Sequence, residues 1–321
     1  MILSKEQTGQ SRDSIIDGIK YILISLVVFG HVKQFTVFDH NSISVSVVGY
    51  TIHSIYLFHM PLFIIISGYF SRQKDNRSFK ESMLKLIRVY LFFQLLWILI
   101  DILNGQSITW ERFFYPSFTL WYLHCLVIWR CILQYIPVHV LNNFYLVIGI
   151  SLLVSMLGGF IPVSNFLALQ RTMTFMPLFF LGFYAKQNGW LEKVYHLKWY
   201  IYLLTAVLFV IGNKVSYDVW GRSPYDTPLD MIRRLVFLSS SIVISIAFIK
   251  VLPSKITLFA NEGQDVLFYY LYHSIILYLF ALFLKYIGVI ADGFVLFTIF
   301  FVTMVTLYYL RRIAILHFPL M

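Results

Sequence analysis

The sequence predicts an all-α fold, a polytopic membrane bundle of about ten transmembrane helices. Hydrophobic residues make up 59% of the 321 residues, aromatic residues reach 19%, and only 12% are charged. A soluble domain carries about twice that charged fraction. The apolar residues also gather in runs close to the ~20 residues that a helix needs to cross ~30 Å of hydrocarbon. We therefore expect one integral membrane domain over residues 1–321.

The apolar runs follow one another with short polar or turn-forming segments between them, and the shortest division lies around Pro162. No segment outside the runs is long enough to form a folded domain. The polar residues 1–14 do not resemble a cleavable signal peptide, so the first run is expected to be a retained span. The predicted spans are 15–36, 45–70, 81–103, 117–136, 143–162, 165–186, 198–216, 230–252, 265–288 and 292–315.

The net charge of +10 is spread between the apolar runs. This pattern favours membrane topology and contact with anionic lipids over binding to nucleic acid. The basic residues are concentrated on the side that would hold both termini, above all in the segment 72–88, which predicts an N-in, C-in protein. Cys125 and Cys131 lie on opposite faces of one run, so neither a disulfide nor a metal pair is expected.

Ionisable side chains at membrane depth are costly, so each one is a candidate site. In the first run, Lys20 and His31 project from nearly the same helix face, roughly 16 Å apart along the axis. Lys20 is also explained as an interfacial lysine that extends toward water, and His31 as a buried histidine held by one hydrogen bond. Gly30 permits close approach of another group, a packed helix included.

Later runs contain further candidates, each with a structural alternative. Pro61 indicates a kinked helix, and Gly68 indicates close helix packing. Arg171 is either an interface anchor or a cation in a cavity. The aromatic segment 113–123 suits either sugar stacking or an interfacial belt. The polar candidates in these runs are His59, Ser67, Tyr122, His124, Arg130, Arg171 and His273.

Five short motifs occur in order along the chain. Asp17, Lys20 and His31 fit a frame of the type Asp-x-x-Arg-Gly followed by His. The others are FHMPLFIIISGY at 58–69, LWYL at 120–123, the segment from Arg171 through Pro177 to Gly182, and YLYH at 270–273. With these motifs the chain resembles acyltransferase family 3 of the membrane-bound O-acyltransferases, especially stand-alone members related to fucose 4-O-acetylases.

The resemblance implies transfer of an acyl group, usually acetyl, from cytoplasmic acyl-CoA to a hydroxyl of a surface polysaccharide or its lipid-linked precursor. It assigns His31 and Asp17 to catalysis, with His31 as general base or as acyl-accepting nucleophile. Lys20 replaces the family's arginine, which keeps the charge but loses the bidentate geometry. No metal is expected, a homo-oligomer is compatible, and the bacterial cytoplasmic (inner) membrane is the expected location.

The basic residues Lys20, Arg72, Lys85, Arg88 and Arg130 are expected to bind acyl-CoA, and the acceptor is expected to contact His59, Ser67, Tyr122, His124, Arg171 and His273. Two other classes of protein stay open. A transporter or flippase of glycan precursors would suit ionisable groups in a basic bundle, although no symmetric pair of broken helices is evident. A b-type haem protein would use histidines as axial ligands, although no run carries two histidines at a separation that holds stacked haems.

Overall fold

The computed structural model describes the chain except residues 1–2, 40, 163–165, 216–220, 253 and 314–321, with side chains described from Ser14 onward, residues 254–255 excepted. Within these ranges the secondary structure is helical, and β pairing is limited to one isolated bridge between Phe38 and Ala291. The prediction of an all-α membrane bundle is therefore confirmed.

Seven helical segments among the described residues are long and apolar enough to cross a membrane, and the apolar helices Phe144–Gly158 and Tyr200–Val215 are shorter. The number ten and the orientation of the termini therefore stay predictions. The seven segments are Ser14–His31, Ile43–Tyr69, Asn76–Leu103, Phe166–Gln187, Asp230–Val251, Val266–Tyr286 and Gly293–Leu310.

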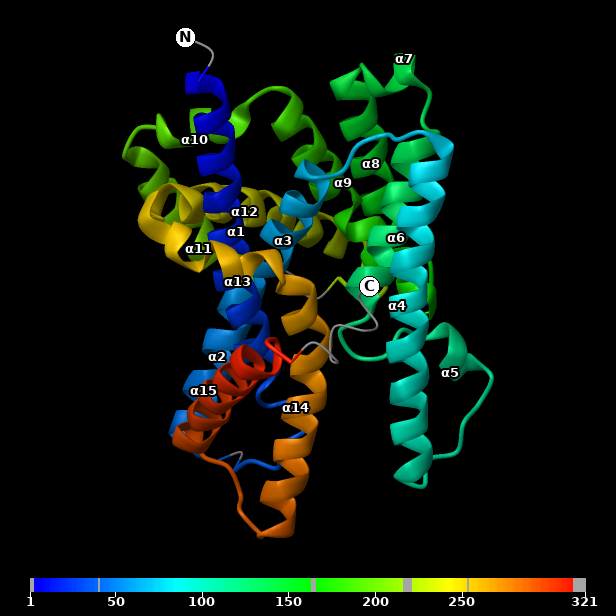
Figure 1. Cartoon of the computed structure of the whole chain (residues 1–321), viewed down its shortest axis with the longest axis vertical. Coiled ribbons are helices and arrows are strands. Elements are labelled where there is room, and N and C mark those ends of the chain that lie inside the picture. The colour runs from blue at the N-terminus through cyan, green and yellow to red at the C-terminus, as the bar shows by residue number, and fades with distance from the viewer. Residues whose placement is uncertain (1–2, 40, 163–165, 216–220, 253, 314–321) are drawn as a thin grey trace. The chain divides into compact units, whose positions relative to one another are not determined.

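The helices follow the predicted runs closely, and Figure 1 labels most of them. Their bounds are α1 Leu3–His31, α2 Ile43–Tyr56, α3 His59–Tyr69, α4 Asn76–Leu103, α5 Glu111–Phe114, α6 Trp121–Tyr135, α7 Val138–Leu141, α8 Phe144–Gly158, η1 Phe166–Ala168, α9 Leu169–Gln187, α10 Trp190–Tyr195, α11 Tyr200–Val215, α12 Asp230–Val251, η2 Ser254–Phe259, α13 Ala260–Gln264, α14 Val266–Tyr286 and α15 Gly293–Leu310.

Short polar side chains define where several of these helices begin. Asp75, Asn143 and Asp292 each precede a helix and accept a hydrogen bond from the backbone N–H three residues later. Such N-caps satisfy donors that the first helical turn leaves unpaired. The hydrogen bond from the Ser78 N–H also lowers the pKa of the exposed Asp75 carboxyl. The starts of α4, α8 and α15 are therefore encoded locally in the sequence.

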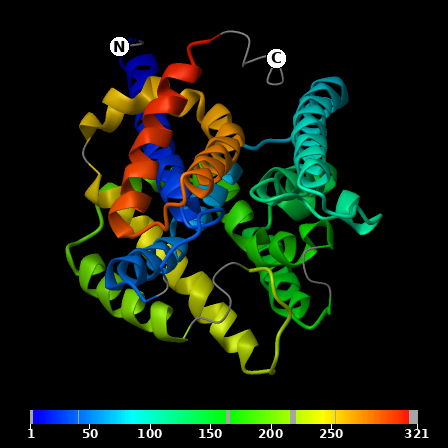
Figure 2. The same cartoon turned by 90° about the horizontal axis from the view of Figure 1, so that it is seen from below.

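The chain divides into two compact units. We call Met1–Phe63 together with Ile244–Phe318 the terminal unit, and Ile64–Val243 the central unit. In the terminal unit, α1 packs against α2, η2, α13, α14 and α15. Figure 2 shows α1 in blue beside α14 in orange and α15 in red. The first predicted span is thus the core helix of its unit.

A glycine crossing brings α1 and α13 together in the terminal unit. A Cβ atom at Gly263 would lie 1.7 Å from the backbone oxygen of Asp17, and one at Gly18 would lie 2.3 Å from that of Ile256. Only residues without a side chain permit this contact, as in other closely packed membrane helices. Arg311, just after α15, forms ion pairs with Glu262 and Asp265 and ties this helix to the same region.

In the central unit, α9 packs against α6 and α8, and α4 packs against α6. The two glycines noted in the sequence motifs, Gly68 and Gly182, form its close crossing. A Cβ atom at Gly68 would lie 1.9 Å from the backbone oxygen of Phe179, and one at Gly182 would lie 1.8 Å from that of Ile65. This confirms that Gly68 permits close packing.

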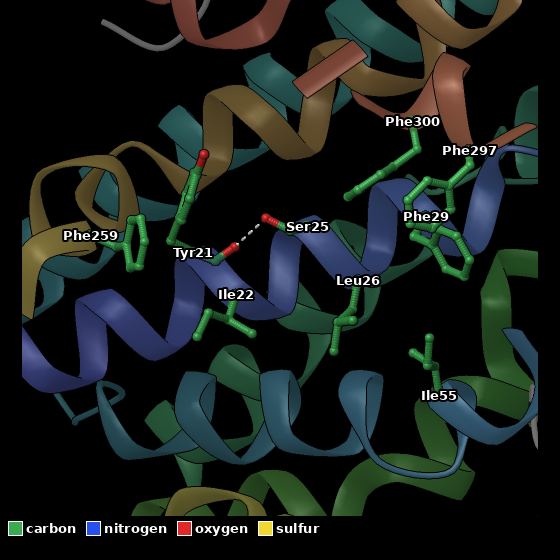
Figure 3. A pocket seen from close by; sticks show the side chains of 9 residues that line it. All are labelled: Tyr21, Ile22, Ser25, Leu26, Phe29, Ile55, Phe259, Phe297 and Phe300. Atoms are coloured by element: carbon green, nitrogen blue, oxygen red, sulfur yellow. Dashed lines mark hydrogen bonds between the residues drawn. The ribbon is translucent and has the colours of Figure 1, made fainter. Parts of the chain in front are cut away.

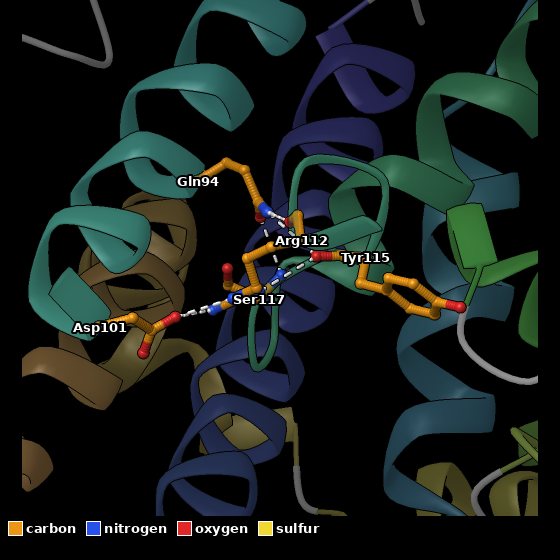
Figure 4. Close-up of polar contacts among 5 residues, drawn as sticks. All are labelled: Gln94, Asp101, Arg112, Tyr115 and Ser117. Carbon is orange, nitrogen blue, oxygen red and sulfur yellow. Dashed lines mark hydrogen bonds and ion pairs between the residues drawn. The ribbon is translucent and has the colours of Figure 1, made fainter. Parts of the chain in front are cut away.

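A polar clip orders the loop between α4 and α6 (Figure 4). Gln94 is buried on α4, where its amide nitrogen donates to the backbone oxygens of Arg112 and Tyr115 at 3.2 and 3.0 Å. Its amide oxygen accepts from the Ser117 N–H at 2.8 Å. Arg112 also pairs with Asp101 at 2.6 Å. One α4 side chain therefore satisfies three backbone groups of the loop.

Candidate active site

Three histidines and one tyrosine, far apart in the sequence, form a cluster inside the terminal unit. His31 ends α1, Tyr56 ends α2, His59 begins α3, and His273 lies on α14. His59 and His273 are 0% exposed and His31 is 9% exposed. The ring centroids of His31 and His273 are 5.4 Å apart, and those of Tyr56 and His59 are 4.4 Å apart. Three residues that sequence reasoning assigned to the site are thus brought together.

Each imidazole in this cluster is held in the same way. The Nδ1 atom of His31 lies 2.7 Å from the Val27 oxygen, four residues earlier in the chain. His59 makes the equivalent contact with Ile55 at 2.8 Å, and His273 with Tyr269 at 3.1 Å. A carbonyl oxygen only accepts hydrogen bonds, so each Nδ1 must carry the proton.

This arrangement fixes the chemistry of the other ring nitrogen. In a neutral imidazole with a protonated Nδ1, the Nε2 atom carries a lone pair and accepts a proton or a hydrogen bond. The Nε2 atom of His31 lies 3.4 Å from the hydroxyl of Tyr56. Those of His59 and His273 are buried and have no hydrogen-bond partner in the described part of the chain. The cluster therefore presents nitrogen lone pairs, which accept hydrogen bonds, in a site that excludes bulk water.

Tyr56 is the member of the cluster that the sequence analysis missed. A Cβ atom at Gly30 would lie 3.2 Å from the Tyr56 ring, so this glycine leaves the space in which the ring lies beside His31. The close approach expected at Gly30 is thus made by an aromatic side chain. The spacing of Tyr56 and His59, three residues apart, was the available signal, because it places both side chains on neighbouring positions of helical backbone.

The kink expected at Pro61 takes the form of a break between α2 and α3. Proline has no N–H, and its ring clashes with the carbonyl four residues earlier, which belongs to Leu57. The helix accordingly stops at Tyr56 and restarts at His59. The Ile55 oxygen, near the end of α2, accepts from the Phe58 N–H and from His59. The break therefore provides the carbonyl that orients the His59 ring.

Asp17 and Lys20 lie on α1, several helical turns before His31. Their side chains pair at 2.6 Å and are about one-sixth exposed. Asp17 precedes His31 by fourteen residues, which corresponds to roughly 21 Å along a helix. The His31 ring is oriented by Val27 instead, so the geometry gives Asp17 a role in holding Lys20 and no contact with the imidazole. The catalytic role of Asp17 stays a prediction.

An open apolar groove of about 440 Å³ runs along α1. Figure 3 shows five α1 side chains lining it, with Phe259, Phe297, Phe300 and Ile55 around them. The α1 residues, from Tyr21 to Phe29, lie on the helix face opposite Lys20 and His31, because each residue turns the helix by ~100°. On the Lys20–His31 face, Leu23, Ile24 and Val27 are buried in protein. The groove thus lies on a different face of α1 from Lys20 and His31.

The remaining candidates belong to the central unit. Ser67 and Tyr122 share a hydrogen bond between their hydroxyls. The Arg171 guanidinium lies 4.5 Å from the Trp121 ring centroid, and His124 packs against Tyr90. Arg72, Lys85 and Arg88 are exposed, and Arg130 is half-buried. The structure places these residues in a different unit from Lys20 and the histidine cluster, so their predicted roles stay predictions.

The two cysteines are not paired with each other. Cys125 and Cys131 are both free thiols, and Cys125 contacts the Thr172 hydroxyl at 3.1 Å. No group of three or more His, Cys, Asp or Glu side chains with a geometry suited to a metal ion is found in the ranges that the structure describes.

The helices and the buried imidazole cluster define a multi-pass membrane protein with a candidate acid–base site. The acyltransferase-domain family matches residues 13–310, a stretch that contains the whole cluster, and the chain belongs to this family. The resemblance drawn from the sequence motifs is thereby confirmed, and the family supports an acyltransferase activity.

Two relatives are nodulation proteins NolL from rhizobia. The protein from Mesorhizobium japonicum (strain LMG 29417 / CECT 9101 / MAFF 303099) is 29% identical over 229 residues, which cover 67% of this chain and 58% of the relative. The chain thus matches somewhat more than half of that relative's length. The protein from Sinorhizobium fredii (strain NBRC 101917 / NGR234) is 44% identical over 61 residues, or 19% of this chain and 16% of the relative. No solved structure matches the chain significantly.

Proposed function

We propose that this protein transfers an acyl group, acetyl in the first instance, from cytoplasmic acyl-CoA to a hydroxyl of a cell-surface polysaccharide or its lipid-linked precursor. The observation that carries the proposal is the Nδ1 contact of His31 with the Val27 oxygen. It directs the basic Nε2 atom into a buried site within the acyltransferase-family region. Imidazole is the side chain that most often acts as a general base toward a hydroxyl group.

In the proposed reaction, one proton moves from the acceptor to His31 and then to the leaving group. The acceptor hydroxyl gives its proton to Nε2 while its oxygen attacks the thioester carbonyl. The carbon–sulfur bond then breaks, and the imidazolium returns the proton to the thiolate of coenzyme A. The Val27 oxygen stabilises the imidazolium, because a hydrogen bond strengthens when its donor becomes charged. His31 is also the last residue of α1, where the helix dipole favours a positive charge.

The location of the protein and the residues that bind acyl-CoA are part of the same proposal. The protein would lie in a bacterial cytoplasmic membrane with both termini inside. The nucleotide phosphates would meet basic side chains at the cytoplasmic face, the candidates being Lys20, Arg72, Lys85, Arg88 and Arg130. Lys20 would act there as a point charge already paired with Asp17. Four of these cations belong to the central unit, so the proposal assigns them no common geometry with Lys20.

The experiment is an acyl-transfer assay with the full chain purified into lipid nanodiscs. Acetyl-CoA labelled in the acetyl group is mixed with lipid-linked oligosaccharides extracted from the native membrane, and label on the glycan is measured. His31→Ala is expected to lower the transfer rate by about 10²–10⁴-fold, the usual contribution of a general base. His139→Ala serves as the matched control, since His139 is an exposed histidine on α7.

Three outcomes would overturn or change parts of the proposal. A folded His31→Ala protein with full transfer activity would remove His31 from the reaction. Movement of the glycan lipid across the bilayer by the wild-type protein, with no label transferred, would support a flippase instead. Labelled protein trapped in the absence of acceptor and lost in His31→Ala would change the role of His31 from base to acyl-accepting nucleophile.

A further inference from the structure

Two polar atoms in the histidine cluster have no hydrogen-bond partner among the residues that the structure describes. The Nε2 atoms of His59 and His273 are fully enclosed, and neither accepts a hydrogen bond in the described part of the chain. Most buried polar side-chain atoms in proteins are hydrogen-bonded. An apolar side chain at either position would avoid this unpaired group. The two atoms are therefore candidates for contact with a ligand.

The ring geometry limits what that ligand can be. The Nδ1 atom of His273 is occupied by the Tyr269 oxygen, so its Nε2 atom only accepts hydrogen bonds in the neutral ring. A phosphate, carboxylate or thioester has no proton to donate to it. Hydroxyl groups do. A ligand atom that contacted this nitrogen would therefore be a hydrogen-bond donor.

His273 lies directly beside the proposed base. Its ring centroid is 5.4 Å from that of His31, and the two rings meet edge to face at 64°. An imidazole nitrogen accepts a hydroxyl at about 2.8 Å. The two imidazole rings are therefore close enough to contact the same sugar ring. His59 packs on Tyr56 and is not part of this assignment.

We propose that the acceptor is a vicinal diol: His31 takes the proton of the hydroxyl that is acylated, and His273 accepts a hydrogen bond from the hydroxyl on the adjacent carbon. The inference rests on the proposed acyl transfer and names the acceptor class for the same site. His273 is then a specificity-determining residue that touches the substrate. It forms no covalent bond and leaves the proton cycle of His31 unchanged.

The test combines a change in the protein with a change in the acceptor. The probes are the methyl glycoside of the sugar found to be acylated by the wild-type protein, and its analogue lacking the adjacent hydroxyl. Loss of that hydroxyl is expected to lower wild-type kcat/KM by about 10–100-fold, since a site built to bind a hydroxyl is left with an unpaired acceptor. His273→Ala is expected to lower kcat/KM for the intact sugar by a similar factor.

The decisive measurement combines the His273→Ala variant with the deoxy sugar. If His273 binds the adjacent hydroxyl, His273→Ala has almost no further effect on the deoxy sugar, because the interaction is already lost. Two losses that multiply would overturn the proposal. His273→Gln, which keeps an acceptor atom, is expected to restore part of the preference for the intact sugar. It also provides a second variant if the alanine protein does not fold.

Slow hydrolysis of acetyl-CoA without acceptor separates this inference from the proposed function. The control variant His139→Ala should hydrolyse acetyl-CoA at the wild-type rate, whereas His31→Ala should not. If the wild-type protein neither hydrolyses acetyl-CoA nor transfers its acetyl group, the proposed function fails. If transfer occurs but the deoxy sugar is acylated as well as the intact one, only the diol assignment fails.

Discussion

Gln94 in the central unit and His273 in the terminal unit are both buried polar side chains, and they differ in how their polar atoms are used. Gln94 is 3% exposed, and its amide makes three hydrogen bonds to loop backbone. His273 is 0% exposed, yet its Nε2 atom has no partner among the described residues. Burial removes both from water, so the unpaired atom is the costly one.

The difference separates a structural polar group from a functional one. A side chain that satisfies backbone groups on another segment, as in Figure 4, stabilises the fold. A ring that is oriented by one nitrogen and leaves the other unused keeps a reactive or binding atom available. The same orientation by a carbonyl four residues earlier occurs at His31 and His59. We therefore expect mutations in the two regions to affect different properties.

Among the polar substitutions, the largest effect on stability is expected for Gln94→Leu. The change leaves the Arg112 carbonyl and the Ser117 N–H without their present partner, whereas the Tyr115 carbonyl still accepts from the Arg112 guanidinium. Each buried group left unpaired costs ~1–3 kcal/mol, so the loss should reach about 2 kcal/mol or more. Thermal unfolding in detergent, followed by size-exclusion chromatography, measures it. An unchanged melting temperature would show that the loop does not depend on the clip.

The sequence predicted the helices well where lipid sets the pattern. The runs 230–252 and 265–288 correspond to α12 at Asp230–Val251 and α14 at Val266–Tyr286. Hydrocarbon demands an apolar surface and paired backbone groups over a fixed length, and both requirements are visible in a linear sequence. The position of the α2–α3 break was predictable for the same kind of reason, since Pro61 acts on its own helix.

The grouping of side chains was harder to predict. His31, His59 and His273 were each chosen as costly ionisable groups, but only tertiary packing brings α1, α3 and α14 together. Tyr56 was missed because an aromatic residue at a helix end resembles the many interfacial tyrosines of a membrane protein. Asp17 was assigned to catalysis through a motif; the structure pairs it with Lys20, and its catalytic role stays a prediction.

A smaller effect, on rate and not on folding, is expected for Tyr56→Phe. The variant keeps the ring that lies over Gly30 and against His59, and it loses the hydroxyl that lies 3.4 Å from the Nε2 atom of His31. A long hydrogen bond of this kind contributes ~0.5–1.5 kcal/mol, so kcat for transfer should fall by about 2–10-fold.

Tyr50→Phe is the matched control for that measurement, because Tyr50 lies on the same helix and is 77% exposed. Its transfer rate should equal that of the wild type. A loss of several hundredfold in Tyr56→Phe would be too large for a positioning contact. It would place the Tyr56 hydroxyl among the groups that react.

The smallest effect on stability is expected for His273→Leu, although the same change should impair transfer. Leucine removes the unpaired Nε2 atom and introduces an apolar side chain among the buried apolar residues of α14, such as Leu271 and Leu277. The free energy of unfolding should therefore stay within ~1 kcal/mol of the wild-type value, because replacing an unsatisfied polar group by an apolar one is nearly neutral or stabilising.

Leu277→Ala provides the contrast one turn further along α14, at a position that is 2% exposed. Cutting back a buried leucine should cost ~2–5 kcal/mol, so the same melting assay must detect this variant as clearly destabilised. A His273→Leu protein that melts as early as Leu277→Ala would mean that Nε2 has a structural partner, such as a buried water. His273 would then belong with Gln94, and the distinction between the two regions would no longer identify the acceptor site.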